Sequence, residues 1–114
     1  MAAIIGGDPA MIAEVCAECG IDVANYNSPG QIVISGVKDL VLKACGILKE
    51  RGVKRALPLN VAGAFHSRMM ASAGAALAPV LEAVPMNAPK FPVLQNFTGE
   101  PESDPAKKPW PLAV

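Results

Sequence analysis

The chain has 114 residues, enough for one modest domain with a buried core but too few for a large two-domain enzyme. Hydrophobic residues make up 52% and charged residues 18%, and ten basic residues balance ten acidic ones. This balance offers no nucleic-acid footprint and no basic patch for a membrane surface. The apolar runs are short and interrupted, so we expect no membrane span. Three cysteines, an odd number, favour a reducing compartment, and the cytoplasm is the expected location.

The first part of the chain predicts a strand, a helix and a second strand. Residues 2–5 are an apolar run that predicts a short buried strand. Asp8 can cap the helix that follows, and Pro9 suits its first position because proline lacks the donor that would be unpaired there. Gly20 is placed to end this helix. A second strand is then expected over residues 21–24.

A turn and three further elements follow. The Pro-Gly pair at 29–30 stands in the order that a type II turn prefers. The β-branched run 31–35 predicts a third strand, and the apolar spacing of 38–51 predicts a second helix. Residues 54–61 predict a fourth strand, which Pro58 assigns to a sheet edge or a bulge because proline cannot donate to a central ladder.

The order βαββαβ predicts the fold class α+β. We expect a ferredoxin-like subdomain over residues 1–61, with two helices on one face of an antiparallel sheet. Beyond it, a helix over 67–84 and a strand over 91–95 do not complete a fold together. We therefore interpret 62–97 as part of a neighbouring domain, and 98–114, rich in Gly, Pro and charge, as a loop or disordered tail.

His66, the only histidine, is the first candidate for chemistry. It stands between the expected fourth strand and the next helix, behind a run of small residues. Histidine is the side chain best suited to move a proton near neutral pH. A histidine that caps a helix or fills a packing gap would look the same, and it is the commoner case. Residue type and position therefore leave both roles open.

The cysteines raise the question of a metal or redox site. Cys16 and Cys19 form a C-x-x-C pair, and a zinc site would need two more ligands, for which Cys45 and His66 are the candidates. The pair lies near a helix end, whereas a thioredoxin-like pair lies at a helix N-terminus. Its apolar neighbours favour buried structural cysteines, so we expect no metal site.

Three motifs follow one another in the chain. They are Asn-Tyr-Asn-Ser-Pro-Gly-Gln-Ile-Val-Ile-Ser-Gly at 25–36, Lys-Arg-Ala-Leu-Pro-Leu at 54–59 and Gly-Ala-Phe-His-Ser at 63–67. In order and spacing they resemble the malonyl-CoA:acyl-carrier-protein transacylase family, which includes the acyltransferase domains of polyketide and fatty-acid synthases. Residues 1–97 follow the family's pattern. The resemblance implies that 62–97 is an incomplete segment of an α/β-hydrolase-like acyltransferase domain.

The resemblance also implies a reaction: transfer of malonyl from coenzyme A to the phosphopantetheine thiol of acyl carrier protein, in fatty-acid or polyketide biosynthesis, without a further cofactor. A family serine takes the malonyl group, and the histidine that His66 matches is the general base that activates it. Phe65 matches the aromatic of malonyl-selective members and would exclude a larger acyl group by about 1–3 kcal/mol, although an ordinary packed aromatic fits too. Asn25 and Asn27 are candidates for substrate contact, and turn capping explains Asn27 almost as well.

The chain also departs from the family pattern. No Gly-x-Ser-x-Gly elbow occurs in it, and the serines that lack this context are Ser28, Ser35, Ser67, Ser72 and Ser103. In the family the nucleophile, the oxyanion-hole donors and the arginine for the malonyl carboxylate precede the ferredoxin-like subdomain. We therefore expect a fragment that supplies the base, lacks the nucleophile and is inactive alone, unless a complementary chain brings the serine.

Acyl carrier protein is the expected partner. Basic residues could meet its acidic surface, although such residues usually form a solvated face. The candidates are Arg51, Lys54, Arg55 and Arg68. The alternative function is a stand-alone ferredoxin-like module for binding or dimerisation, in which exposed apolar surface pairs two copies as a homodimer.

Overall fold

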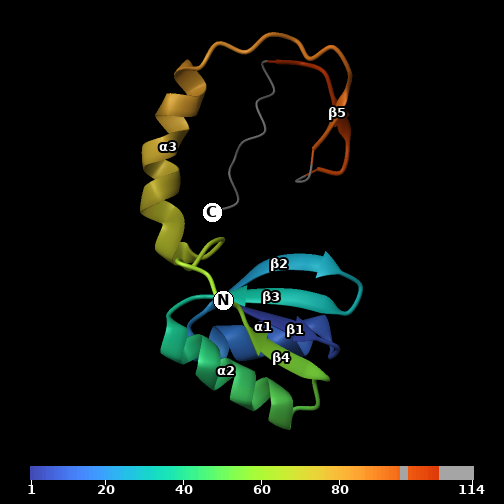
Figure 1. Cartoon of the computed structure of the whole chain (residues 1–114), viewed down its shortest axis with the longest axis vertical. Helices are drawn as coiled ribbons and strands as arrows, with labels where there is room; N and C mark the ends of the chain where they lie inside the picture. Colours follow the sequence, from blue (N-terminus) through green and yellow to red (C-terminus); the bar gives the residue numbers. More distant parts are fainter. Residues whose placement is uncertain (96–97, 106–114) are drawn as a thin grey trace. The chain divides into compact units, whose positions relative to one another are not determined.

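The structure, a computed structural model, describes residues 1–95 and 98–105 and has two compact units that meet between Ala71 and Ser72. The first unit holds β1 (Ala2–Ile5), α1 (Pro9–Cys19), β2 (Asp22–Ser28), β3 (Gln31–Ser35), α2 (Lys38–Glu50), β4 (Arg55–Pro58) and the 3-10 helix η1 (Arg68–Met70) (Figure 1). The elements that follow are α3 (Ala71–Ala83), β5 (Val93–Leu94) and β6 (Pro101–Glu102).

The first unit is built on a four-stranded sheet with the order β2-β3-β1-β4, in which each neighbouring pair is antiparallel. Ala2 lies opposite Ile34 on one side and Pro58 on the other. β4 is an edge strand, which confirms the edge position that Pro58 predicted. The predicted α+β class is confirmed, and so is the βαββαβ order of these elements.

An apolar core lies between one face of this sheet and the helices α1 and α2 (Figure 1). Alternate strand residues point into it, as the two-residue period of a strand requires; they are Ala2, Ile4, Ile32, Ile34 and Ala56. The helices contribute their apolar stripes, with Ile12, Val15, Cys16 and Cys19 from α1 and Val41, Ala44, Cys45 and Leu48 from α2. Burial of each large side chain stabilises the unit by about 1.5–3 kcal/mol.

Local signals fix where α1 and the β2–β3 hairpin begin and end. Asp8 caps α1 by accepting a hydrogen bond of 3.1 Å from the amide of Met11, and Gly20 ends α1 in the left-handed region at φ 67°. Gly30 has φ 80°, the conformation that the second central residue of a type II turn needs. These predictions are confirmed.

Two strands differ in length from their predictions. β2 continues to Ser28 instead of ending at residue 24, because β3 offers it a ladder as far as Gln31. Two register irregularities let β2 follow this ladder. β4 ends at Pro58, three residues before the predicted end, although the Leu59 amide still donates to the Met1 carbonyl at 3.0 Å.

The second unit is less densely buried. The helix predicted over 67–84 forms as η1 followed by α3, and α3 contributes no buried residue. The strand predicted over 91–95 shortens to Val93–Leu94 and pairs with Pro101–Glu102. The prediction of a loop throughout 98–105 was therefore wrong, because β6 lies within it. Residues 106–114 of the predicted tail lie outside the described residues.

The segment with His66 belongs to the first unit, together with the sheet. The predicted division into 1–61, 62–97 and 98–114 refers to a larger enzyme and stays a prediction. Among residues 1–95 and 98–105, no helix has the length and apolar character needed to span a membrane.

Candidate functional site

His66 lies in a turn, residues 62–70, that is tied back to the sheet. After β4 the Leu59 amide bonds to the Met1 carbonyl, and the Val61 amide bonds to the Leu59 carbonyl at 3.1 Å. The chain therefore leaves the sheet beside the start of β1 with its backbone already fixed. We call residues 62–70 the His66 turn.

Ser67 closes the His66 turn from the inside. Its side chain is 1% exposed, and its hydroxyl donates to the Ala64 carbonyl at 2.6 Å. The same oxygen accepts from the Met69 amide at 3.3 Å, which caps the short helix η1. The Met70 amide donates to the Ser67 carbonyl at 2.9 Å. Ser67, which lacks the sequence context of a nucleophile, thus stabilises the turn from within.

His66 itself is exposed and has φ 54°, in the left-handed region. Within residues 1–95 and 98–105 the other positive φ angles belong to glycines. A side chain other than glycine pays an energy of order 1–3 kcal/mol there and keeps the conformation only where its surroundings enforce it. Such residues cluster at functional sites. The sequence carried no signal for this conformation.

Asp22, the first residue of β2, anchors the other side of the turn. One carboxylate oxygen accepts from the Arg68 backbone amide at 2.8 Å, and the Arg68 guanidinium donates to the other oxygen at 2.6 Å through its terminal nitrogen and 3.0 Å through Nε. Hydrogen bonding from Arg68 holds the pKa of Asp22 below its usual value, and Asp22 raises the pKa of Arg68. Sequence analysis missed Asp22, because the two residues are far apart in the chain.

Phe65 is half-exposed, and its ring folds back over Gly63. A Cβ atom at Gly63 would lie 3.4 Å from the ring, an ordinary van der Waals distance, so the ring packs close to this residue. A cavity of about 470 Å³ adjoins the turn, lined by Ala62, Gly63, Ala64 and Met69 on one side and by the start of α2 on another. Phe65 and His66 of the same turn are exposed.

Asn25 and Asn27 lie on the exposed edge strand β2. The Asn25 side-chain amide donates to the Asn27 oxygen at 3.4 Å, and Asn27 donates to the Gln31 side-chain oxygen at 3.0 Å. This hydrogen-bonded row runs from β2, the strand whose first residue, Asp22, binds the His66 turn, to the first residue of β3. Turn capping was the alternative that the sequence left open for Asn27; the hydrogen bonds found join it to the side chains of Asn25 and Gln31.

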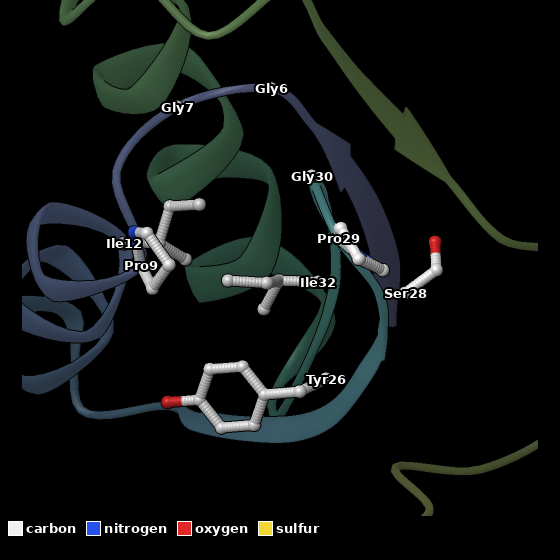
Figure 2. A pocket seen from close by; sticks show the side chains of 9 residues that line it. All are labelled: Gly6, Gly7, Pro9, Ile12, Tyr26, Ser28, Pro29, Gly30 and Ile32. Carbon is white, nitrogen blue, oxygen red and sulfur yellow. The ribbon is translucent and has the colours of Figure 1, made fainter.

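A second hollow of about 330 Å³ lies between the start of α1 and the β2–β3 hairpin (Figure 2). Tyr26, Ile12 and Ile32 line it, together with Pro29 and the glycines of the two loops. It is at the end of the sheet where β1 finishes, whereas the His66 turn starts beside the first residue of β1. The lining of this hollow does not include His66.

The cysteines lie in the core. Cys16, Cys19 and Cys45 are buried free thiols, and burial, with a contribution from Cys19, raises the pKa of Cys16 to about 11. A thiol with that pKa is not a nucleophile near neutral pH. In the described part of the chain no three His, Cys, Asp or Glu residues gather as a group that could hold a metal ion.

Of the four basic candidates for partner contact, two are engaged in ion pairs. Arg51 bridges from the end of α2 to Glu14 at 3.0 Å and Glu18 at 3.3 Å, and Arg68 binds Asp22. Lys54 and Arg55, at the start of β4, are exposed.

Comparison with known proteins shows what this chain is similar to. No family model matches the chain. Over 100 residues it is 45% identical to the malonyl CoA-acyl carrier protein transacylase of Escherichia coli strain K12, and the match covers 84% of this chain and 32% of that protein. The chain is therefore similar to a segment of malonyl CoA-acyl carrier protein transacylases. It spans about a third of the length of the curated relatives that it matches.

Solved structures of the transacylase family agree. An acyl carrier protein S-malonyltransferase from Vibrio cholerae matches with a TM-score of 0.82 and 42% identity, over 95% of this chain and 37% of that one. A malonyl-transacylase solved in complex with its type II PKS acyl-carrier protein matches with a TM-score of 0.84 and 38% identity, over 92% and 35% of the two chains. The fold described above is therefore the fold of this segment in known transacylases.

Proposed function

We propose that this chain supplies the general base of malonyl transfer from coenzyme A to the phosphopantetheine thiol of acyl carrier protein. The observation that carries the proposal is the conformation of His66. It is exposed in the left-handed region, on a turn fixed by Ser67 and Asp22, and inside the transacylase motif. A histidine that merely filled a packing gap would be buried and would not need a strained backbone.

In this mechanism His66 moves one proton in each half-reaction. It takes the proton of a serine hydroxyl as the serine oxygen attacks the malonyl thioester, and it returns that proton to the coenzyme A sulfur as the carbon–sulfur bond breaks. The thiol of the carrier protein then gives its proton to His66 and attacks the serine ester, and the serine oxygen recovers the proton as it leaves. The serine comes from a part of the transacylase that this sequence does not contain, so we expect no transfer by this chain alone.

Phe65 is proposed to set the acyl specificity. Its half-exposed ring over Gly63 would limit the space at the malonyl Cα atom, because the ring stands next to the base. Replacing Phe65 with Ser should improve the use of methylmalonyl relative to malonyl by about 10- to 200-fold, the range expected for one methyl group. The ratio of the two kcat/KM values in the reconstituted system below measures this, and an unchanged ratio would contradict it.

The proposal extends to the fold and the substrate face. The strand order β2-β3-β1-β4, with two helices on one face, supports a ferredoxin-like subdomain joined to a segment of an α/β-hydrolase-like acyltransferase domain. Asn25 and Asn27 are proposed to contact the substrate from the exposed face of β2. Their side chains carry both donors and acceptors, which suits the amides of a pantetheine arm.

Acyl carrier protein is the proposed partner, since a similar transacylase has been solved with one. We assign the electrostatic contact to Lys54 and Arg55, because Arg51 and Arg68 already bind carboxylates of this chain. A contact of this kind is weakened by salt and acts mainly on the rate of association.

One observation favours the alternative, a module that binds or dimerises. From β4 onward the chain exposes large apolar side chains at 39–44% of their area; they are Leu57, Leu59, Val61 and Phe65. Exposed apolar surface of this kind commonly packs against another surface. Size-exclusion chromatography with light scattering distinguishes the readings: a discrete dimer supports the module, and a monomer or heterogeneous aggregates support the transacylase segment.

The test of the proposed function is reconstitution. The chain is mixed with malonyl-CoA, acyl carrier protein and the serine-bearing segment of a related transacylase. We expect transfer on mixing, its loss in His66→Ala and His66→Asn, and its retention in the control Glu14→Ala on α1. Asparagine tolerates the left-handed region, so His66→Asn removes the imidazole without disturbing the turn. Transfer that survives both His66 variants would overturn the proposal.

A further inference from the structure

We propose that Asp22 is a positioning residue for His66 and acts through Arg68. This inference deepens the proposed function and rests on it, because it concerns how the proposed base is held. Asp22 does not belong to any of the three motifs that carry the family resemblance.

The contacts reach the main chain of the His66 turn as well as a side chain. The Arg68 amide, two residues beyond His66, donates to Asp22 at 2.8 Å, and the guanidinium adds bonds of 2.6 and 3.0 Å to the same carboxylate. A carboxylate that binds both groups of one residue fixes the direction in which the chain leaves His66. Bidentate pairs of this kind are also geometrically specific.

A second ion pair in the same unit shows what an ordinary surface bridge looks like. Arg51 reaches Glu14 and Glu18 with its side chain only, and it links the exposed sides of two helices. Such bridges contribute little. The Asp22 carboxylate is less exposed, at 24% against 62% for Glu14, and it alone of these carboxylates bonds a backbone amide of the partner arginine. The difference points to a role in backbone geometry.

Two buried serine side chains lie near the contact between Asp22 and Arg68. Ser67, next to Arg68, is buried and braces the turn from inside. Ser35 is the register partner of Asp22 across β2 and β3, and its buried hydroxyl has no hydrogen-bond partner among the described residues. Polar groups are costly in an interior, and native proteins keep few of them without a purpose. Ser35 is paired with Asp22 and Ser67 precedes Arg68, so both serines lie beside the contact that holds the turn.

Together these contacts explain how His66 keeps its strained backbone. Ser67 fixes the turn internally, and Asp22 ties its far end to β2. Without Asp22 the turn would keep its internal bonds and its attachment beside β1 but lose the attachment of its far end to β2, so His66 would sample other conformations. The carboxylate is charged at neutral pH, since Arg68 lowers its pKa, and the attachment is therefore present above about pH 4, the ordinary pKa of an aspartate, and is lost as the pH falls through the lowered value.

The first test measures the turn in the chain alone, by ¹⁵N relaxation of the backbone amides. We expect an order parameter for His66 near 0.85 in the native chain and below about 0.6 in Asp22→Ala. Arg68→Ala keeps the backbone bond and should show a smaller loss, and the control Glu14→Ala, which removes one of the two carboxylates that pair with Arg51, should show none. An unchanged His66 in Asp22→Ala would overturn the inference. If Asp22→Ala does not fold, Arg68→Ala decides, because its exposed side chain leaves no cavity.

The second test uses the reconstituted transfer reaction. A base that is present but poorly placed lowers kcat, so Asp22→Ala should reduce kcat about 10- to 100-fold and leave the KM for malonyl-CoA within about twofold. A change in KM with an unchanged kcat would contradict positioning. Disorder of His66 in Asp22→Ala, with no transfer by the native mixture, would remove the proposed function and leave the structural role of Asp22 intact. Transfer by both chains at equal kcat would remove the positioning role alone.

Discussion

The two units of this chain bury their apolar residues very differently. Residues 1–71 enclose a core in which Ile4, Ile34 and Leu48 are fully buried. In α3, by contrast, Leu77 is 43% and Val80 58% exposed. The helix is apolar on nearly all sides, a pattern that fits a helix packed inside a larger fold. The comparison teaches that the unit carrying His66 has its own core, whereas α3 depends on surroundings that it does not provide.

Truncation of a core side chain in the first unit should destabilise the protein far more than truncation of a side chain in α3. Leu48→Ala deletes a fully buried side chain between α2 and the sheet and should lower the free energy of unfolding by about 2–5 kcal/mol. The matched change Leu77→Ala removes a side chain that is partly exposed, and should alter it by less than about 0.5 kcal/mol. Urea unfolding of both variants measures the difference. Equal losses would show that α3 belongs to the same cooperative core.

Substitution of two glycines of the first unit by alanine should change the stability of the protein in opposite directions. A Cβ at Gly36 would lie 2.6 Å from the Ile21 side chain, so Gly36→Ala should destabilise by about 1–3 kcal/mol. Gly46 lies on the exposed side of α2 with nothing within 4 Å, and Gly46→Ala should stabilise by about 0.5–1 kcal/mol through helix propensity. Thermal unfolding followed by circular dichroism measures both. Two changes of the same sign would contradict the packing described here.

The bridge between the two helices should matter less. Arg51→Ala removes the bonds to Glu14 and Glu18, whose side chains are 62% and 47% exposed, and should cost about 0.2–1 kcal/mol. The cost should shrink in 1 M salt, because exposed ion pairs are screened. Urea unfolding at low and high salt tests this. A cost that salt leaves untouched would mean that packing of the arginine stem, rather than charge, holds the helices.

The smallest effect on the free energy of unfolding is expected from the largest change to the chain, the deletion of its second unit. A chain of residues 1–71 keeps every member of the core and should retain the free energy of unfolding of the full chain to within about 0.5 kcal/mol. Hydrogen exchange of the full chain should agree, with protected amides in β1 and β3 and fast exchange in α3. A shortened chain that fails to fold would show that the second unit stabilises the first.

Prediction from sequence worked where the signal is local. Asp8, Pro9 and Gly20 mark the ends of α1 through their own backbone preferences, and Pro58 marks an edge strand because it lacks a donor. The motif that contains His66 was likewise readable as consecutive residues. What escaped prediction depends on residues distant in the chain: the extension of β2 along β3, the pairing of β5 with β6, and the binding of Arg68 by Asp22. The role of Ser67 as a brace follows from the fold of the turn and has no signature in the pattern.

The conformation of His66 sets chemistry against stability at one position. The left-handed region favours glycine and asparagine, and neither carries a group that accepts a proton near neutral pH. Replacing His66 by glycine should therefore raise the free energy of unfolding by about 1 kcal/mol while removing the proposed base. A selection for stability alone would thus drift away from histidine at this position, and a selection that demands transfer would hold it there against the preference of the backbone.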